Sequence, residues 1–511
     1  MFANTIFHST KVISGDNFKP ISGYVALNGD KIIGIGVDSF EKYKGPDTII
    51  IDLGDKLICP GFVDTHCFFT GFLLQNSGKD FSEFQAISDV LSYLKDNTSN
   101  HTKPTYFLVG KISRVLHIDR DKLDIISSDV PIMIFDEDFE YCSMNNVAIS
   151  TYGFTPTSCG SEDCNKLLRV LLEDTQIAQK FFLEYVKMMN SFGITAIKEM
   201  GFDDFSGFTD TLESLESSNS LNIRVHFMSQ PVGAPMNLDY AKTMREKFKS
   251  DFLRFSGFNQ MTDGSISQFE GEMKSPYENR DITCALNIDW DKLESDTLSA
   301  DANDFRFSLH AQGDGAIHKS LKIFEKCKKD DFGKLINRHV MTDLECSDSV
   351  DLDEMGKLGV GAEIYPQIMS FASRNEKVSM INEKIGEVRG KQYWNRRKMQ
   401  DSGINISCAT DLPLLYDDIG ESIYHSVGAL FPEGGIPFNP ENALTTSELI
   451  RAWSLGGQYN LGMEEKLGTL EEGKLADITV LDRDVFEVPM SEIRDVKVYM
   501  TIVNGKIVYQ A

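Results

Sequence analysis

The feature that most constrains the fold is an alternation of short apolar runs and helical stretches between residues 59 and 455. Apolar runs of this length, separated by amphipathic helices, are typical of parallel strands joined by helical crossovers. We therefore expect the middle of the chain to form a parallel α/β barrel. The predicted strands include residues 105–109, 131–135, 194–197, 223–227, 305–309, 335–338, 360–364 and 404–407, and the predicted helices include residues 176–189, 317–328 and 347–357.

Short strands are also predicted at both ends of the chain, outside the alternating region. Asn28-Gly29-Asp30 is a hairpin signal between two of them, and Asn504-Gly505 is a second turn signal near the C-terminus. Because neither terminal group could cover its own apolar face, we expect both to build one small β-domain from residues 1–58 and 456–511, with residues 59–455 in the barrel. The predicted terminal strands are residues 11–13, 23–27, 31–36, 48–52, 476–482, 496–503 and 506–509.

Composition excludes several classes of protein. The 511 residues include 51 basic and 77 acidic side chains, for a formal charge of −26, so nucleic-acid phosphates and anionic membranes would be repelled on average. Nine cysteines lack paired CxxC spacing, which argues against a zinc ribbon or a disulfide framework and favours reduced thiols. The sequence shows no signal-peptide pattern and no run of eighteen apolar residues. We expect a soluble cytoplasmic protein that binds neither nucleic acid nor membrane.

Residues with metal-binding side chains stand at the ends of separate predicted strands. His66 follows the apolar pair Phe62-Val63, His310 closes residues 307–309, His339 closes residues 335–338, and Asp411 follows residues 407–410. The carboxyl ends of parallel strands converge at one mouth of a barrel. Three imidazoles and one carboxylate suit a borderline divalent ion such as Zn²⁺, with ligand atoms about 2.0–2.2 Å from the metal.

Each of these four residues also has an ordinary structural interpretation. His310 could cap the helix that follows it, His339 could be a hydrogen-bonded core histidine, and Asp411 could be a turn residue before Pro413. A single residue of this kind therefore carries little weight. The metal hypothesis rests on the set of four.

Taken together, six motifs resemble the amidohydrolase superfamily, and most of all amidohydrolase family 3, which includes N-substituted formamide deformylase-like proteins. The resemblance implies a distorted TIM (β/α)8 barrel with a small β-sandwich formed by both chain termini. It also implies metal-assisted hydrolysis of carbon–nitrogen bonds, and a homodimer is the usual state of the resembling proteins. The motifs lie in the expected order at residues 60–66, 193–195, 262–265, 310–317, 410–413 and 468–477.

The chain departs from the family pattern at several positions. Where the family usually carries His-x-His, this sequence has Phe68 in place of the second imidazole, and phenylalanine cannot bind a metal. Asn259 aligns with the bridging carboxylated lysine of the family and cannot form a carbamate. Glu140 aligns with a substrate-facing histidine. Lys198 could supply a carbamate from a neighbouring strand, or it could be an ion-pair or surface lysine beside Glu199.

Two groups of site residues follow from the motifs and from the strand ends. His66, His310, His339 and Asp411 are the expected metal ligands, and Asp411, His339 and His310 are the expected catalytic residues. Tyr365 follows the predicted strand 360–364, where it would line the pocket or pack in the core. The expected substrate-binding residues are Glu140, Asn259, Asp263 and Tyr365.

The favoured hypothesis is a hydrolase that uses one divalent metal ion, zinc first and iron or manganese as alternatives, on an amide, formamide or cyclic imide-like bond of a small molecule. Asp411 would take a proton from the attacking water and return it to the leaving nitrogen. Because Phe68 and Asn259 argue against a two-metal centre, two alternatives stay open. The barrel could catalyse an isomerisation, hydration or decarboxylation that depends little on metal. It could also be a non-catalytic descendant that binds a ligand.

Overall fold

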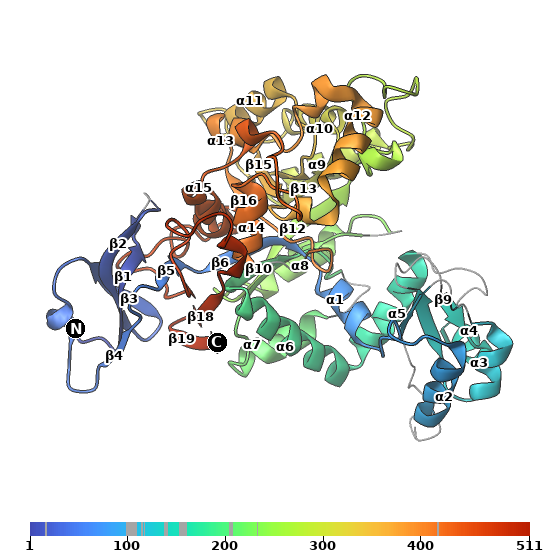
Figure 1. Ribbon diagram of the computed structural model, residues 1–511, viewed down its shortest axis with the longest axis horizontal. Coiled ribbons are helices and arrows are strands. Elements are labelled where there is room, and N and C mark those ends of the chain that lie inside the picture. Colours follow the sequence, from blue (N-terminus) through green and yellow to red (C-terminus); the bar gives the residue numbers. More distant parts are fainter. Residues whose placement is uncertain are drawn as a thin grey trace.

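Eight parallel strands form the central sheet of the protein, seen here in a computed structural model. Their order is β16-β15-β14-β13-β12-β11-β10-β6, so each strand lies beside the next strand of this sheet along the chain. The first and last, β6 and β16, stand at the two edges (Figure 1). The strands are β6 (Phe62–Cys67), β10 (Ile194–Glu199), β11 (Arg224–Ser229), β12 (Leu253–Met261), β13 (Arg306–Ala311), β14 (Val340–Asp343), β15 (Gly361–Ile364) and β16 (Ile406–Cys408). The structure describes the whole chain except residues 16–17, 99–109, 114–115, 117, 137–141, 153–160, 204–207, 232–233 and 416–417.

Contacts between the first and last strands nearly close this sheet into a barrel. Cys67 forms a parallel bridge with Leu412, and the Thr65 hydroxyl donates to the Cys408 carbonyl oxygen at 3.0 Å. Both faces of the strands are buried, as expected for a sheet covered by helical crossovers. The predicted distorted TIM barrel is confirmed.

The helices around the barrel form where apolar residues recur with helical spacing. In α6 (Thr175–Ser191), Asp174 caps the N-terminus by accepting from the amides of Gln176 and Ile177, and one face is buried against the barrel. The sequence predicts this helix at residues 176–189. The other helices of the barrel region are α1 (Phe69–Asn76), α7 (Thr209–Ser217), α8 (Leu238–Lys247), α9 (Trp290–Ala302), α10 (Asp314–Phe324), α11 (Ser349–Leu358), α12 (Arg374–Gly390), α13 (Arg396–Asp401), α14 (Ile419–Ser426), α15 (Thr446–Arg451) and α16 (Gly457–Leu461).

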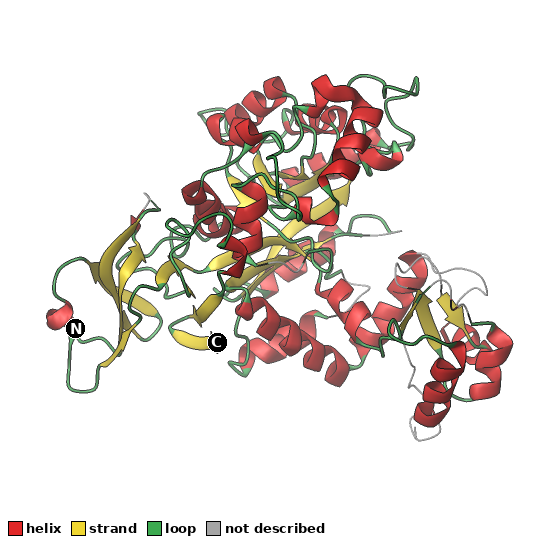
Figure 2. Cartoon of the chain, viewed as in Figure 1, coloured by secondary structure: helices red, strands yellow, loops and turns green. Residues whose placement is uncertain are grey.

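Strands from both termini form a second sheet of eight strands, as predicted, and this part of the molecule is mostly strand (Figure 2). The antiparallel pair of β17 with β5 joins the C-terminal strands to the N-terminal ones. Gly29 and Gly505 have φ angles of 60° and 77°, which explains the glycine in each predicted hairpin turn. The strands are β1 (Thr5–Ile13), β2 (Pro20–Asn28), β3 (Lys31–Gly36), β4 (Ile49–Asp52), β5 (Leu57–Pro60), β17 (Ile478–Leu481), β18 (Val498–Val503) and β19 (Lys506–Gln510).

A buried ion pair connects the terminal sheet to the barrel. Arg224 on β11 donates to both carboxylate oxygens of Asp477, at 2.7 and 2.9 Å. Asp477 is the last residue of the predicted motif at residues 468–477, and its Oδ1 also accepts from the Asn504 amide at 2.8 Å. This motif therefore holds the two sheets together.

A small lobe with its own apolar core is inserted between α1 and α6 and lies apart from the barrel (Figure 1). It corrects one prediction, because the run at residues 131–135 forms β8 (Met133–Asp136) in this lobe and not a barrel strand. An isolated apolar run does not specify which sheet it joins. The predicted strand 105–109 lies outside the described residues. The lobe contains β7 (Lys111–Ile112), β9 (Cys142–Met144), α2 (Ile87–Thr98), α3 (Arg120–Ile126), α4 (Asn146–Tyr152) and α5 (Ser161–Glu173).

The predicted strand at residues 335–338 is wrong, because the sixth barrel strand, β14, begins at Val340. Arg338 has a φ of 50°, which is incompatible with a strand, and its guanidinium donates to Glu464 at 2.7 Å. Across the described part of the chain, no helix is both long and apolar enough to cross a membrane.

Candidate active site

His66 and Asp411 lie together at the mouth of the barrel. His66 is near the end of β6, and the Asp411 amide donates to its carbonyl oxygen at 2.8 Å. Asp411 has a φ of 51°, and its Oδ1 lies 3.7 Å from His66 Nε2. Burial raises the pKa of Asp411. The sequence prediction that these two residues meet at a strand mouth agrees with this geometry.

Asp64 fixes the two segments that carry this pair. Its carboxylate accepts from the His66 amide at 3.1 Å and from the amide and hydroxyl of Thr410 at 3.2 and 2.6 Å. Burial raises the pKa of Asp64 to about 7, although these hydrogen bonds oppose the shift. Asp64 is thus a structural link beneath the site, between β6 and the segment that carries Asp411.

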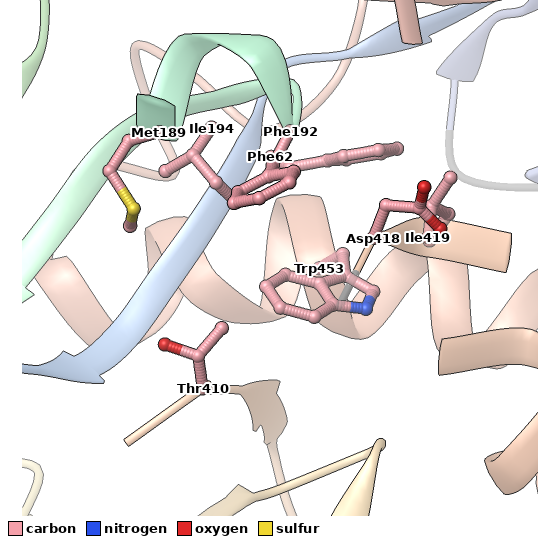
Figure 3. Close-up of a pocket in the computed structure, with 8 residues that line it drawn as sticks. All are labelled: Phe62, Met189, Phe192, Ile194, Thr410, Asp418, Ile419 and Trp453. Atoms are coloured by element: carbon pink, nitrogen blue, oxygen red, sulfur yellow. The ribbon is translucent and has the colours of Figure 1, made fainter. Parts of the chain in front are cut away.

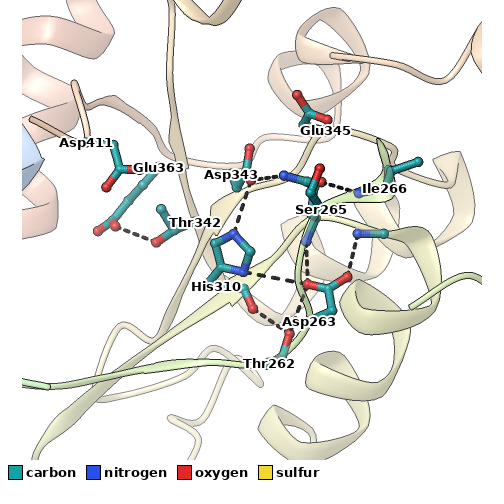
Figure 4. Close-up of polar contacts among 12 residues, drawn as sticks. Thr262, Asp263, Ser265, Ile266, His310, Thr342, Asp343, Glu345, Glu363 and Asp411 are labelled. Atoms are coloured by element: carbon teal, nitrogen blue, oxygen red, sulfur yellow. Dashed lines mark hydrogen bonds and ion pairs between the residues drawn. The ribbon is translucent and has the colours of Figure 1, made fainter. Parts of the chain in front are cut away.

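His310 forms a second pair with Asp343, on the neighbouring strand (Figure 4). His310 Nε2 lies 3.2 Å from Asp343 Oδ2, and its Nδ1 lies 3.6 Å from Asp263. Burial alone would lower the pKa of His310, but Asp343, Asp263 and Asp411 raise it to about 9. The carboxylates around His310 therefore hold a positive charge in place.

Asp343 was not among the residues predicted from the sequence. This residue ends β14, and in the sheet register it lies opposite Ala311, one position beyond His310 on β13. The signal was present as an acid after Val340-Met341-Thr342, but the strand was predicted five residues too early. Gln312 also donates to the Asp343 carboxylate, at 2.7 Å.

His339 does not join this cluster. It precedes the first residue of β14, so it lies at the opposite end of the parallel strands from the mouth. Its Nδ1 accepts from the Phe307 amide at 3.0 Å, its Nε2 lies 3.0 Å from Asp301 Oδ1, and its ring stacks on Phe324. Both ring nitrogens are used, and the expectation that His339 ends a strand at the mouth is corrected.

The predicted substrate-binding residues have different surroundings. Asp263 is buried and accepts from the amides of Gln312, Gly313 and Glu272, each at 2.9 Å, so it anchors the turn after β13. Burial raises its pKa to about 6. Glu140 lies outside the described residues.

Asn259 and Tyr365 both point into the barrel region. Asn259 on β12 donates to the Gln230 side chain at 2.7 Å, while its buried Oδ1 has no hydrogen-bond partner among the described residues. The Tyr365 ring lies 6.1 Å from the His66 ring in an edge arrangement, and the Phe68 ring lies 5.5 Å from the His66 ring. Aromatic side chains thus flank His66 on two sides.

A buried ion pair between Lys198 and Glu363 lies beneath His66. Lys198 Nζ donates to Glu363 Oε1 and, at 3.2 Å, to Asn460 Oδ1. The amine is therefore engaged as an ammonium donor, and the ion-pair interpretation of Lys198 is the one that this geometry fits. Glu363 was not predicted as a site residue, because nothing in the sequence of its strand distinguishes it from a surface acid.

The donors at the mouth fit a borderline divalent ion in their chemistry. Metal bonds of about 2.0–2.2 Å place two ligands of one tetrahedral ion about 3.3 Å apart. The pairs His66–Asp411 and His310–Asp343 are separated by 3.7 and 3.2 Å. Two imidazoles and two carboxylates are nitrogen and oxygen ligands of the type that zinc, iron and manganese accept.

A different cluster brings three potential ligand atoms closer together, namely Asp301, Cys327 and His339, within 4.8 Å of one another. Among the described residues, the mouth donors do not form such a set and remain as two pairs. However, His339 Nδ1 accepts a backbone hydrogen, so Nε2 must carry the ring proton that Asp301 accepts. Burial also raises the pKa of the Cys327 thiol to about 12. This cluster is a hydrogen-bonded core contact without a free imidazole lone pair or a thiolate for a metal.

An apolar pocket outside the barrel wall lacks such donors. Figure 3 shows it between β6, β10 and the helices behind them, with the rings of Phe62 and Trp453 6.4 Å apart. Its polar lining is limited to two side chains, so it offers packing space and not a reaction centre. The lining residues are Phe62, Met189, Phe192, Ile194, Thr410, Asp418, Ile419 and Trp453.

Comparison with known proteins identifies sequence relatives of parts of the chain and a structural relative of nearly the whole fold. N-substituted formamide deformylase of Arthrobacter pascens is 32% identical over 114 residues, which are 22% of this chain and 21% of that protein. The exoenzymes regulatory protein AepA of Pectobacterium carotovorum subsp. carotovorum is 24% identical over 365 residues, or 64% of this chain and 78% of that one. An uncharacterized metal-dependent hydrolase from Pyrococcus horikoshii OT3 superimposes with a TM-score of 0.76 at 18% identity, covering 95% of this chain and 99% of the other.

A family model described as the amidohydrolase family matches residues 50–509, which include the whole barrel and the strands β5, β17 and β18 of the terminal sheet but not β1, β2 and β3. The match agrees with the motif order, the parallel barrel and the strand-end donors. The resemblance predicted from the sequence is confirmed, and the chain belongs to the amidohydrolase family.

Proposed function

We propose that the protein is a hydrolase that uses one divalent metal ion to cleave a carbon–nitrogen bond in a small molecule. The observation that carries the proposal is that two imidazole–carboxylate pairs, His66 with Asp411 and His310 with Asp343, lie at the carboxyl ends of the barrel strands. Membership of the amidohydrolase family and the similarity to a formamide deformylase support an amide, formamide or cyclic imide-like substrate.

His66 and Asp411 form one half of the proposed metal site, and His310 and Asp343 form the other. When bound, a divalent ion supplies Lewis acidity and makes a bound water more acidic. Zinc is the first candidate, with iron and manganese as alternatives, because all three accept imidazole and carboxylate ligands. Relative to the sequence prediction, Asp343 takes the place that His339 was expected to fill.

Asp411 is the proposed proton carrier. Its side chain keeps 26% of its surface exposed, whereas Glu363 beneath the site is fully buried, so Asp411 faces the space from which a substrate enters. Its pKa is raised by burial, which makes it a better base than an exposed aspartate. It would accept a proton from the attacking water at a carboxylate oxygen and then deliver that proton to the leaving nitrogen.

His310 is the proposed partner for the substrate oxygen. With three carboxylates raising its pKa to about 9, it retains a ring proton at neutral pH when no other cation is present. A positively charged donor stabilises the negative charge that develops on a carbonyl oxygen during hydrolysis. Metal ligand and hydrogen-bond donor are alternative roles for this ring. If His310 is a ligand, His310→Ala should lose metal, and if it is only a donor, the variant should keep its metal.

Tyr365 and Phe68 are the proposed apolar sides of the substrate pocket. Their rings lie edge-on to His66, which restricts the direction in which a substrate can approach Asp411. Asn259, with its unpartnered buried oxygen among the described residues, offers an acceptor to a substrate N–H group. We further propose a cytoplasmic setting, since the described cysteines are unpaired, and a homodimer.

The proposed function is tested with a panel of N-formyl amines, amides and cyclic imides. Purified protein is assayed after chelation and again after loading with zinc, manganese or iron, beside an Asp411→Asn variant. Glu199→Gln is a matched control, because Glu199 is a buried carboxylate whose partners are the Phe69 and Gly201 amides. We expect metal-dependent turnover that Asp411→Asn loses and Glu199→Gln keeps. Absence of turnover on every compound with every metal would contradict the proposal.

A further inference from the structure

The Glu363 carboxylate is saturated with hydrogen-bond donors, and His66 is one of them. Its Oε1 accepts from Lys198 and, at 2.8 Å, from Asn460. Its Oε2 accepts from the Thr342 hydroxyl at 2.7 Å and faces His66 Nδ1 at 3.2 Å. The side chains of both Glu363 and Lys198 are fully buried. An ionised carboxylate accepts only, so this arrangement requires the His66 proton on Nδ1.

The position of that proton determines what the other ring nitrogen can do. With Nδ1 protonated, the lone pair of His66 lies on Nε2, and Nε2 faces Asp411 at 3.7 Å. In the opposite tautomer, Nδ1 would turn a lone pair toward a carboxylate, which is repulsive, and Nε2 would carry a hydrogen into the mouth. The carboxylate therefore decides whether His66 presents an acceptor or a donor to the site.

We propose that Glu363, held by Lys198, is the positioning residue that fixes the tautomer and ring orientation of His66 and so presents its Nε2 lone pair to the barrel mouth. This inference rests on the proposed function in one respect, because a presented lone pair matters most if a metal binds there. Carboxylate partners of metal-binding histidines act in this way in other metal sites.

Lys198 makes the arrangement permissible in the barrel interior. A lone buried carboxylate would take up a proton and could then donate to His66 Nδ1, which reverses the tautomer. The ammonium of Lys198 keeps Glu363 ionised, and Asn460 holds both members because it also bonds to each of them. Arg306 donates to the same Asn460 oxygen at 2.7 Å, which orients the amide.

Two double variants separate the hydrogen bond to His66 from the buried charges. Lys198→Met with Glu363→Gln removes both charges but leaves an amide oxygen that can accept from Nδ1. Lys198→Met with Glu363→Leu removes the charges and the acceptor at similar volume. Both variants remove the two charges of the ion pair and keep the buried Arg306 guanidinium, so melting temperatures check that the two proteins are comparably folded. Glu199→Gln serves again as the matched control, since Glu199 follows Lys198 on β10 but contacts the Phe69 and Gly201 amides.

The first readout is the His66 tautomer in metal-free protein, measured by ¹⁵N NMR of histidine-labelled chain and assigned with His66→Gln. We expect Nδ1–H in the wild type, in the Glu199 control and in the glutamine double variant. The leucine double variant should lose that preference. Nδ1–H in the leucine variant, or Nε2–H in the wild type, would overturn the inference.

The second readout is zinc binding by titration calorimetry, with zinc alone as the probe. We expect the leucine double variant to bind zinc about 10–100-fold more weakly than the glutamine double variant. Equal affinities would overturn the inference. If the wild type binds no zinc, iron or manganese, the proposed function fails, while the tautomer measurement still decides whether Glu363 positions His66.

Discussion

Lys198 and Glu363 form an ion pair inside the barrel, although 165 residues separate them in the sequence. Lys198 comes from β10 and Glu363 from β15, so the pair spans the barrel interior. Both side chains have no exposed surface, so the pair has no access to water. An ion pair in such a place is costly to form and more costly to break, because removal of one partner leaves an uncompensated charge.

The single variant Lys198→Met is therefore expected to lower the free energy of unfolding by about 3–5 kcal/mol. Lys198→Met with Glu363→Leu should recover most of that loss, because it removes both members of the pair. Urea unfolding measures both values. Lys249→Met is the exposed control, since Lys249 pairs with Glu246 at the surface and should change the free energy by less than about 1 kcal/mol. Additive effects of the two buried substitutions would contradict the pairing.

Asp411→Asn is expected to lower kcat by about 10²–10⁴-fold, because an amide cannot accept and return a proton. The KM should change much less, since asparagine keeps the size and the backbone contact to His66. Steady-state kinetics on the best compound of the panel provides the test, with the melting temperature as the check on folding. A kcat within threefold of the wild type would exclude Asp411 as the proton carrier.

Asp477→Asn is expected to loosen the terminal sheet from the barrel. The substitution removes the charge that pairs with buried Arg224, and about 3–5 kcal/mol of stability should be lost. Arg224→Met should cost a similar amount, and the double variant should cost less than the sum. Urea unfolding of the three proteins measures this coupling. A loss below about 1 kcal/mol for either single variant would mean that apolar packing alone joins the two sheets.

His226 is expected to make stability depend on pH on the acid side. Burial, followed by the nearby cations Arg254 and Arg306, lowers its pKa to about 3, whereas the unfolded value is about 6.5. Because the folded pKa is lower, the neutral ring contributes stability that is complete above pH 6.5 and is lost as the pH falls toward 3. Relative to His226→Gln, the wild type should therefore lose about 1.4 kcal/mol per pH unit between about pH 6 and 4.

Urea unfolding of both proteins at several pH values checks this prediction. Carboxylates titrate in the same interval, but they do so in both proteins, so their contribution cancels in the difference. Parallel stability curves for the wild type and His226→Gln would show that His226 does not take part.

The barrel and the terminal sheet could be predicted because their signals are local. In the middle of the chain, short apolar runs alternate with stretches whose apolar residues have helical spacing. Near the ends, Gly29 and Gly505 mark turns that need positive φ angles. The lobe that contains β8 could not be separated from the barrel, since its apolar run has the same length and composition as a barrel strand. Sheet membership depends on pairing with distant residues, which one strand does not encode.

The site shows the same division. His66, His310 and Asp411 stand at or just beyond the ends of recognisable strands, so their placement at the mouth could be predicted. Asp343 occupies the strand end at which His339 was predicted, because β14 begins after the positive φ of Arg338. The amino-acid type at position 338 does not reveal this backbone conformation. The pair of Lys198 with Glu363 depends on contact between strands far apart in the sequence.

The most direct test of the proposed function is anomalous X-ray diffraction from crystals of the full chain grown with zinc, recorded on both sides of the zinc absorption edge. We predict one anomalous peak at the barrel mouth, beside His66 Nε2 and Asp411, and its absence in the leucine double variant at the same zinc concentration. A peak at Asp301, Cys327 and His339 instead, or no peak in wild-type crystals grown with zinc, iron or manganese, would contradict a metal-dependent reaction at this mouth.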